Sequence, residues 1–322
     1  MGFLFKRKKK ESAGLFIDRG IYRYIALKGQ PGEYEVLRAV AGKLSASVGP
    51  DGEPYVEPGK SLNAALREIT REIGEFSTAV NLSLPTSDSL MRTVPMPEME
   101  PDEARMAFRY DYERYFPFSV QEALFDLAPI VYPLPGGGEE KRYLVASARK
   151  AFIDGIMDSA SLNDLEINAL EPAQIALERA ITPELNVLDA VVYVYAGRRR
   201  SVLILSWKGN GIYHRSISES FEGGLLGDDG GPDGQLAKNM FVREMHSSLQ
   251  FALSQIRGFE PDTMVVFGPG CTESLLELLK ETVQMESVIR SDPFDVHGIE
   301  FSSHDKSAGS WEIPLGLALR DI

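Results

Sequence analysis

An Asp-x-Gly turn near the start of the chain is the first place where the residue types favour chemistry. Asp18-Arg19-Gly20 separates the apolar run Leu15 to Ile17 from a second run rich in aromatic and β-branched residues. Two such runs around a glycine turn predict a β-hairpin. Glycine lets the backbone approach a ligand, turn amides can face a phosphate, and the Asp18 carboxylate can hold Mg²⁺. The turn is therefore a candidate phosphate loop.

Other residue types that carry chemistry show no spacing typical of a site. The four histidines lack metal-ligand spacing, and we expect them at the surface or hydrogen-bonded in the core: His214, His246, His297 and His304. Cys271 has no paired base in a recognisable motif. Asp228-Asp229 lies in a glycine-rich loop, where solvated carboxylates are expected. The motifs therefore predict no catalytic residue and no metal site.

Composition narrows the class of protein. A chain of 322 residues with 43% hydrophobic residues favours roughly two domains with a substantial core. The formal net charge of −13 argues against nucleic acid as a partner. A single cysteine excludes an intrachain disulfide and fits a reducing cytoplasm. No run approaches the roughly twenty apolar residues of a membrane span, and the start does not resemble a signal peptide.

The first residues oppose the overall acidity. Phe3, Leu4 and Phe5 precede five consecutive basic residues, Lys6 to Lys10. Each basic residue near an anionic membrane surface contributes about 1 kcal/mol, so residues 1–13 form a basic tail that could anchor weakly to such a surface. A disordered, solvated tail is the alternative. Both interpretations stay open.

The two halves of the chain show one order of predicted elements: three strands, a helix, a strand and a helix. In the first half, the hairpin of residues 14–28 and a strand at 32–44 precede a helix at 61–76 and a strand at 77–85. In the second half, strands at 188–196, 201–207 and 212–217 precede a helix at 235–256, a strand at 263–267 and a helix at 272–284. A repeat of roughly 180 residues predicts two related α/β domains, with a boundary near residues 182–187.

The intervening residues predict further elements of both kinds. We expect a strand at 89–95, a helix from 96 to about 115, and a hairpin from strands at 127–134 and 142–148. A helix at 150–161, a strand at 167–172 and a helix at 173–181 follow. A short helix at 313–320 closes the chain. Several aromatic residues gather near the first of these helices, and they either form a core or line a partner groove: Phe108, Tyr112, Tyr115, Phe116 and Phe118.

This order of strands and helices is typical of actin-like ATPases. Within that group, the chain resembles the PilM-type type IV pilus assembly proteins, which are relatives of the cell-division protein FtsA. Residues 17–20 occupy the place of the family's Ile-Asp-x-Gly opening. Other segments resemble family motifs along nearly the whole chain: Arg92 to Pro97 with Asp102 to Ala104, Tyr112 to Phe118, Asp126, Leu144 to Lys150, Glu171-Pro172, Ser291 to Phe294 and Leu315 to Arg320.

The resemblance implies an actin-like (ribonuclease H-like) two-domain α/β fold with an inserted α+β subdomain. The first domain would span residues 14–182, with the insertion at about 78–165, and the second would span 187–322. It also implies a cytoplasmic location beneath the inner membrane. There the family binds the N-terminal tail of PilN, a single-span membrane protein, in a groove of the insertion, and connects to the pilus motor ATPases.

The resemblance further implies ATP and Mg²⁺ in a cleft, with Asp18, Gly20, Gly197, Gly268 and Gly270 as the cofactor-binding residues. This sequence departs from the family's loops. Ile21 replaces the hydroxyl residue after Gly20, and Ile25 stands where the family has a lysine. The second loop, Tyr193 to Gly197, has no carboxylate. The basic turn Arg198 to Arg200 could bind phosphate without metal, but a solvated turn is favoured.

The departures favour a scaffold with a degenerate nucleotide cleft. One alternative is a slow ATPase whose nucleotide state controls partner binding. Another is the cytoplasmic domain of a type II secretion platform protein, although that protein normally continues into a membrane span and we expect none before Ile322.

Overall fold

The computed structural model describes residues 10–18, 20–45, 47–48, 54–55, 60–84, 88–183, 188–197, 200–217, 232–301, 311–320 and 322. The basic tail up to residue 9, Arg19, Arg198-Arg199, Asp228-Asp229 and His304 lie outside these residues. Within the described part, no helix is long and apolar enough to cross a bilayer.

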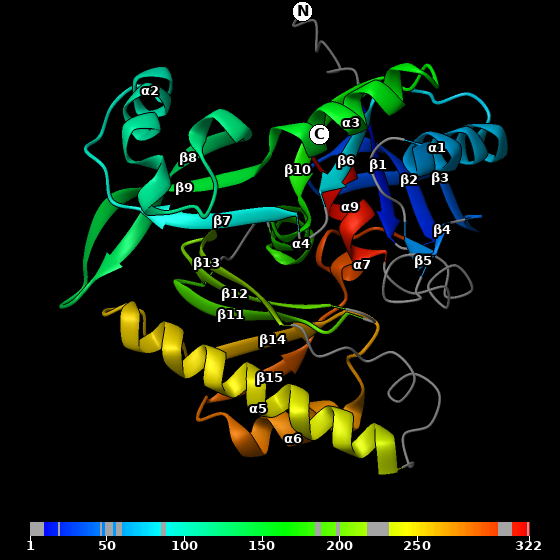
Figure 1. The fold of residues 1–322 in the computed structure, drawn as a ribbon. Coiled ribbons are helices and arrows are strands. Elements are labelled where there is room, and N and C mark those ends of the chain that lie inside the picture. Colours follow the sequence, from blue (N-terminus) through cyan, green and yellow to red (C-terminus); the bar gives the residue numbers. More distant parts are fainter. Residues whose placement is uncertain are drawn as a thin grey trace, which may run out of the picture.

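Two five-stranded sheets of the same topology form the body of the molecule (Figure 1). The first contains β1 (Lys10–Asp18), β2 (Ile21–Gln30), β3 (Glu33–Lys43), β6 (Val80–Leu84) and β10 (Ile167–Pro172), in the order β10-β6-β1-β2-β3. The second contains β11 (Ala190–Tyr195), β12 (Ser201–Trp207), β13 (Asn210–Ile217), β14 (Thr263–Phe267) and β15 (Ser287–Arg290). Its order, β15-β14-β11-β12-β13, repeats that of the first sheet strand for strand.

The directions of the strands repeat as well. In each sheet the first three strands pair in an antiparallel way with their neighbours in sequence. The fourth strand pairs in parallel with the first, and the fifth pairs in parallel with the fourth. The predicted duplication is therefore confirmed. The opening hairpin is confirmed too: Asp18 pairs with Ile21, and Gly20 adopts φ +104°, a conformation that glycine reaches without a steric penalty.

Helices cover both sheets and fill the space between them. Helices α1 (Lys60–Ile73) and α3 (Lys150–Ser161) pack on the outer face of the first sheet. Helices α5 (Pro232–Gln255) and α6 (Glu273–Thr282) pack on the outer face of the second. Between the sheets lie α4 (Ala173–Ile181) and α9 (Glu312–Ala318), with the short α7 (Pro293–Val296) beside them. Two short strands, β4 (Ser47–Val48) and β5 (Pro54–Tyr55), pair with each other.

Amphipathic spacing explains how α1 is placed. The apolar side chains at helical spacing are all buried against the sheet: Leu62, Ala65, Leu66, Ile69 and Ile73. One apolar stripe on a charged helix is what a sheet face requires to complete its core. The helix begins and ends within three residues of the range that the sequence predicts.

A separate three-stranded sheet forms the insertion, which stands beside the two domains (Figure 1). Its strands β7 (Ser89–Val94), β8 (Ala123–Leu134) and β9 (Gly138–Arg149) lie in the order β7-β9-β8. Helix α2 (Pro101–Asp111) and the 3₁₀ turns η1 (Tyr112–Arg114) and η2 (Val120–Glu122) complete it. The aromatic cluster forms its core: Phe108, Tyr112 and Phe116 are buried, and Tyr115 and Phe118 pack against them.

The boundaries expected for the insertion, 78–165, are too wide. Strand β6 lies between β1 and β10 in the first sheet, and α3 packs on α1. The insertion itself therefore spans β7 to β9, residues 89–149. A second difference concerns α9, which the sequence assigns to the second domain but which packs on β1 and α4. Strand β15, which is not among the elements expected from the sequence, is a short edge strand parallel to β14.

Candidate functional site

The first predicted loop is a compact turn whose backbone groups bond within the fold. The carbonyl of Gly20 accepts a hydrogen bond of 2.8 Å from the amide of Leu44, and Gly20 itself is buried. Asp18 is half-buried at the end of β1. Gly20 thus has a structural role without any ligand, because it forms the turn that connects the paired strands β1 and β2.

The second and third predicted loops lie side by side. Strands β11 and β14 are parallel neighbours with Tyr195 opposite Phe267, so Gly197 and Gly268 follow paired strand ends. The amide of Gly270 donates to the carbonyl of Ala196 over 2.8 Å. The structure therefore brings Gly197, Gly268 and Gly270 together.

Close packing explains the glycines in these two loops. A Cβ at Gly268, where φ is +98°, would lie 2.7 Å from the ring of Tyr195. A Cβ at Gly197 would lie 2.1 Å from the carbonyl oxygen of Arg200. Tyr195 itself is buried, 5.4 Å from the ring of Phe267 between centroids. Glycine is required at both positions by neighbouring protein atoms.

The described residues of these loops include neither a cluster of metal ligands nor a reactive thiol. Among the described residues, no three His, Cys, Asp or Glu side chains could hold a metal ion together. Cys271, which follows Gly270, is buried, and burial raises the pKa of its thiol to about 11. A thiol that stays protonated at neutral pH is a poor nucleophile. ATP and Mg²⁺ at these loops stay a prediction.

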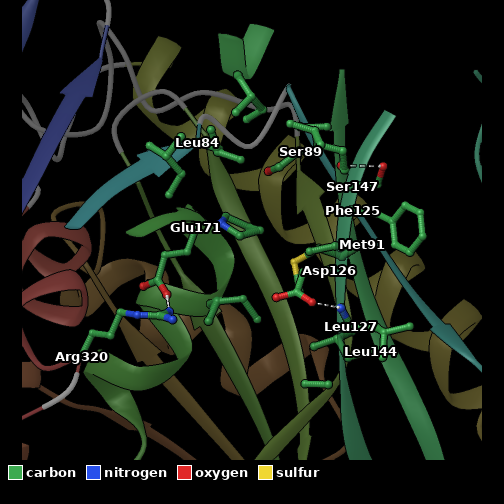
Figure 2. A pocket seen from close by; sticks show the side chains of 18 residues that line it. Leu84, Ser89, Met91, Phe125, Asp126, Leu127, Leu144, Ser147, Glu171 and Arg320 are labelled. Carbon is green, nitrogen blue, oxygen red and sulfur yellow. Dashed lines mark hydrogen bonds and ion pairs between the residues drawn. The ribbon is translucent and has the colours of Figure 1, made fainter. Parts of the chain in front are cut away.

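A pocket of about 430 Å³ lies between the insertion and the first domain (Figure 2). One wall comes from β7, β8 and β9, and the other from the ends of β6 and β10, from α3 and α4, and from Arg320. Its lining is Leu84, Ser89, Met91, Leu124, Phe125, Asp126, Leu127, Ala128, Leu144, Ala146, Ser147, Ala148, Ile153, Leu170, Glu171, Pro172, Ile175 and Arg320. Aliphatic side chains with a few polar groups are typical of a binding pocket. We call it the insertion pocket.

An ion triad forms the first-domain side of the insertion pocket. Glu171 is 4% exposed and accepts hydrogen bonds from Arg179 at 2.6 and 3.0 Å and from Arg320 at 2.5 Å. Arg179 also donates to the carbonyl of Gly316 over 2.7 Å. A buried carboxylate needs such compensation, because an unpaired buried charge is costly. The triad ties β10, α4 and the end of the chain together at the pocket wall.

Asp126 lies across the pocket from Glu171 and Arg320 (Figure 2). Its Oδ1 accepts hydrogen bonds from Nε of Arg105 at 2.8 Å and from the amide of Leu127 at 2.9 Å. Within the described residues, its Oδ2 has no hydrogen-bond partner, and the side chain is 73% exposed. Leu124, two residues earlier, is 43% exposed at the same wall. This wall therefore offers an acceptor oxygen beside an exposed aliphatic side chain.

An aromatic core packs behind the base of the insertion wall. Burial raises the pKa of Tyr112, so its phenol stays neutral, and it shares a 2.7 Å hydrogen bond with Ser147. Ser147 also donates to the carbonyl of Leu124. Tyr112 stacks on Phe116, with centroids 4.9 Å apart. The aromatic core thus fixes β8 and β9, which carry most of this wall.

The insertion is also attached to the second domain. Thr93 donates to the carbonyl of Ile212 over 2.6 Å, and Glu139 pairs with Lys208 at 2.5 Å. The hydrogen bond from Lys208 lowers the pKa of Glu139. Ile130 and Tyr132 of β8 belong to the core of the second domain. One wall of the insertion pocket is therefore tied to the second domain, and the other belongs to the first.

Four of the segments that resemble PilM-type proteins meet in this pocket. They supply Asp126, Leu144 with residues 146–148, Glu171-Pro172 and Arg320. The resemblance identified these segments one by one, but it did not predict that they form one site, because they are spread over nearly 200 residues of the chain. None of the five predicted cofactor-binding residues lines it.

Comparisons with known proteins agree on the fold. A family model described as type IV pilus assembly protein PilM matches residues 19–223. No curated protein sequence matches the chain. A solved structure described as the PilM-PilN type IV pilus biogenesis complex is similar with a TM-score of 0.74 at 19% identity, covering 96% of this chain and 98% of that one.

Two further structures are more distant. The cytoplasmic domain of EpsL from Vibrio cholerae, an inner membrane component of the type II secretion system, has a TM-score of 0.52 at 11% identity, covering 94% of this chain and 98% of that one. A Bacteroides thetaiotaomicron protein with an actin-like ATPase fold and unknown function has a TM-score of 0.48 at 10% identity, with 92% and 98% covered. The predicted actin-like fold with an insertion is confirmed.

Proposed function

We propose that this chain, which belongs to the type IV pilus assembly protein PilM family, is a scaffold of a pilus assembly platform. In this proposal the insertion pocket binds the N-terminal tail of a PilN-like inner-membrane protein. The observation that carries it is the convergence of four family-like segments on one pocket between the insertion and the first domain. The similarity to a chain of a PilM-PilN complex supports the same partner.

The chemistry of the pocket fits an extended peptide. Strand β8 is an edge strand, and Leu124 to Ala128 line the pocket in succession. An edge strand can accept a peptide by strand addition, while the aliphatic lining takes its side chains. Pro129 has no amide hydrogen to donate, so strand addition would be confined to the residues before it.

Charge favours a basic partner. Cytoplasmic segments beside a membrane span carry an excess of Lys and Arg, and this chain has a net charge of −13. Oδ2 of Asp126 is the acceptor that a basic side chain of the tail would reach. Arg320, on the other wall, would face a carbonyl or carboxylate of the same tail.

In this proposal the nucleotide cleft is degenerate and the chain does not turn over ATP. The second loop lacks a carboxylate, and the ring of Tyr195 packs against Gly268. Calorimetry with ATP and Mg²⁺ tests this. A micromolar affinity would favour the slow ATPase instead.

The proposal extends to the membrane surface and to the pilus motor ATPases. A scaffold that holds a membrane protein's tail would work in the cytoplasm at the inner membrane, and the basic residues 1–13 would add contact with anionic lipid. It would connect to the pilus motor ATPases from the cytoplasmic side. The type II secretion alternative has a fold similarity at 11% identity, whereas the family match favours the pilus.

The partner is tested with a synthetic peptide of the N-terminal tail of the PilN-like protein from the same organism. We expect the Leu124→Asp variant to lose at least about tenfold in affinity, because a charge replaces an apolar contact worth about 1.5 kcal/mol or more. Leu162→Asp is the matched control, since Leu162 is 69% exposed and lies outside the pocket lining. Equal losses in both variants, or no binding by the wild type, would refute the assignment.

A further inference from the structure

A second cavity of about 380 Å³ lies beside the insertion pocket, at the joint between the two domains. Its lining comes from α4 and the residues after it, from the β12–β13 turn, from the insertion, and from Tyr34, His297 and the chain's last residues. It is remote from the predicted nucleotide loops. The β12–β13 turn lies at the opposite end of β11 from Gly197, because Trp207 pairs with Ala190. We call it the joint cavity.

The two cavities adjoin. Leu144 of β9 and Ile175 of α4 line both of them, and both side chains are partly exposed. Along α4, the insertion pocket reaches Ile175 and the joint cavity continues from Ile175 to Thr182 and Pro183. Two aliphatic side chains from facing elements are thus the boundary between the cavities.

We propose that the joint cavity is the second chamber of one peptide channel, and that the partner's tail continues into it past Leu144 and Ile175. This inference rests on the proposed function of the insertion pocket. The channel would run alongside α4 from Pro172 to Thr182. These positions are ten residues apart, which at about 1.5 Å per residue of helix is about 15 Å. An extended peptide covers that distance with about five residues. The second chamber therefore takes the residues that flank the segment held in the insertion pocket.

Two charged side chains of the second chamber, Glu178 and Arg179, are already paired, which selects the residues that enter it. Glu178 accepts the amide of Gly211 at 2.6 Å and pairs with His214 at 2.8 Å. A Cβ at Gly211 would lie 2.1 Å from Oε2 of Glu178, so a side chain at this position would displace the carboxylate from the turn. Arg179 is engaged by Glu171. With these charges engaged, the chamber suits uncharged or aliphatic residues beside Ile130 and Leu319.

A tail that fills both chambers contacts both domains at once. The first chamber lies between the insertion and the first domain. The second touches α4 on one side and the β12–β13 turn on the other, where Glu178 already links the domains. Binding would therefore hold the two domains at one relative position, and affinity would depend on that position.

The test compares a synthetic peptide of about eight residues from the tail with peptides extended by about five residues at either end. We expect one extension to bind about tenfold more tightly to the wild-type chain. Asn210→Trp, which places a ring in the second chamber, should remove that gain and leave the short peptide's affinity unchanged. Gln250→Trp on the exposed face of α5 is the matched control.

A second readout does not depend on affinity. With a mild oxidant such as oxidised glutathione present, the Asn210→Cys variant should form a disulfide with an extended peptide that ends in cysteine, while Gln250→Cys should not. Cys271 is buried and does not compete. If the short peptide binds but neither extension gains affinity and no disulfide forms at position 210, the channel is wrong and the proposed function stands. If the short peptide fails to bind, the proposed function itself is wrong.

Discussion

The prediction that tests the pocket's chemistry most directly concerns Asp126. Changing Asp126→Asn keeps the shape of the side chain and removes its charge. The lost interaction is that of an exposed carboxylate with a basic group of the tail, because the side chain is 73% exposed. Such pairs are worth about 0.2–1 kcal/mol. The expected loss is therefore about 1.5- to 5-fold in affinity.

Salt separates this effect from a change of shape. The screening length falls from about 30 Å at 0.01 M ionic strength to about 3 Å at 1 M. Fluorescence anisotropy with a labelled tail peptide should show the Asp126→Asn loss at low salt and nearly equal affinities of variant and wild type at high salt. Asp111→Asn is the matched control, since Asp111 is an exposed partner of Arg114 outside the pocket.

The same substitution should have little effect on the stability of the folded chain. Arg105 also pairs with Asp102 at 2.7 Å, and asparagine retains an Oδ1 acceptor. We expect the free energy of unfolding to change by less than about 0.5 kcal/mol. A loss of affinity that persists unchanged at high salt would refute the electrostatic reasoning, and no loss at low salt would remove Asp126 from the binding site.

Three further predictions concern the framework around the two cavities and loops. Glu171→Gln should lower the free energy of unfolding by about 2 kcal/mol, because two partly exposed arginines lose their charged partner; unchanged urea unfolding would contradict this. Gly268→Ala should cost more than Gly298→Ala in thermal unfolding: both have positive φ, but only Gly268 faces Tyr195, and equal costs would argue against the packing explanation. The Cys271 thiol, with its pKa raised from 9.0 to about 11, should react with a thiol reagent at pH 8 far more slowly in the folded than in the unfolded chain. Because the unfolded thiol loses its proton first, this group's contribution to stability should fall between about pH 9 and pH 11, and rapid labelling of the folded chain would contradict the burial.

Local sequence patterns were enough to predict the repeated domains. The turn at Gly20, the period of α1 and the apolar runs of β11 and β14 each report structure within a few residues of the chain. Two such series in the same order predict the same topology twice. The sheets have that topology, with every strand in the corresponding place.

Non-local pairing explains what the sequence did not predict. Val80 to Leu84 is an apolar run whose partners, β1 and β10, lie about seventy and ninety residues away. Periodicity says that such a run is buried, but not where a subdomain begins. The expected insertion, 78–165, therefore included β6, although the repeat placed the same strand in the first domain. Helix α9 was placed in the wrong domain for the same reason, since its contacts are with β1 and α4.

The candidate site also depends on residues that are far apart in the sequence. Asp126, Glu171 and Arg320 come from three distant segments, and nothing in their spacing predicts that they line one pocket. The predicted glycines, by contrast, carry a strong local signal that admits two causes, a bound phosphate or a close protein neighbour. At Gly268 the neighbour is the ring of Tyr195, which no local pattern at Gly268 reveals.

The attachment of the insertion decides how a bound tail would act on the whole molecule. Thr93 and Glu139 fasten the insertion to the second domain, while the Glu171 triad fastens the opposite wall to the first. A ligand between these walls therefore bridges the two domains even if it touches only one of them directly. In the proposed function, a scaffold with a degenerate nucleotide cleft would bridge its two domains through the bound tail of its partner instead of through a nucleotide.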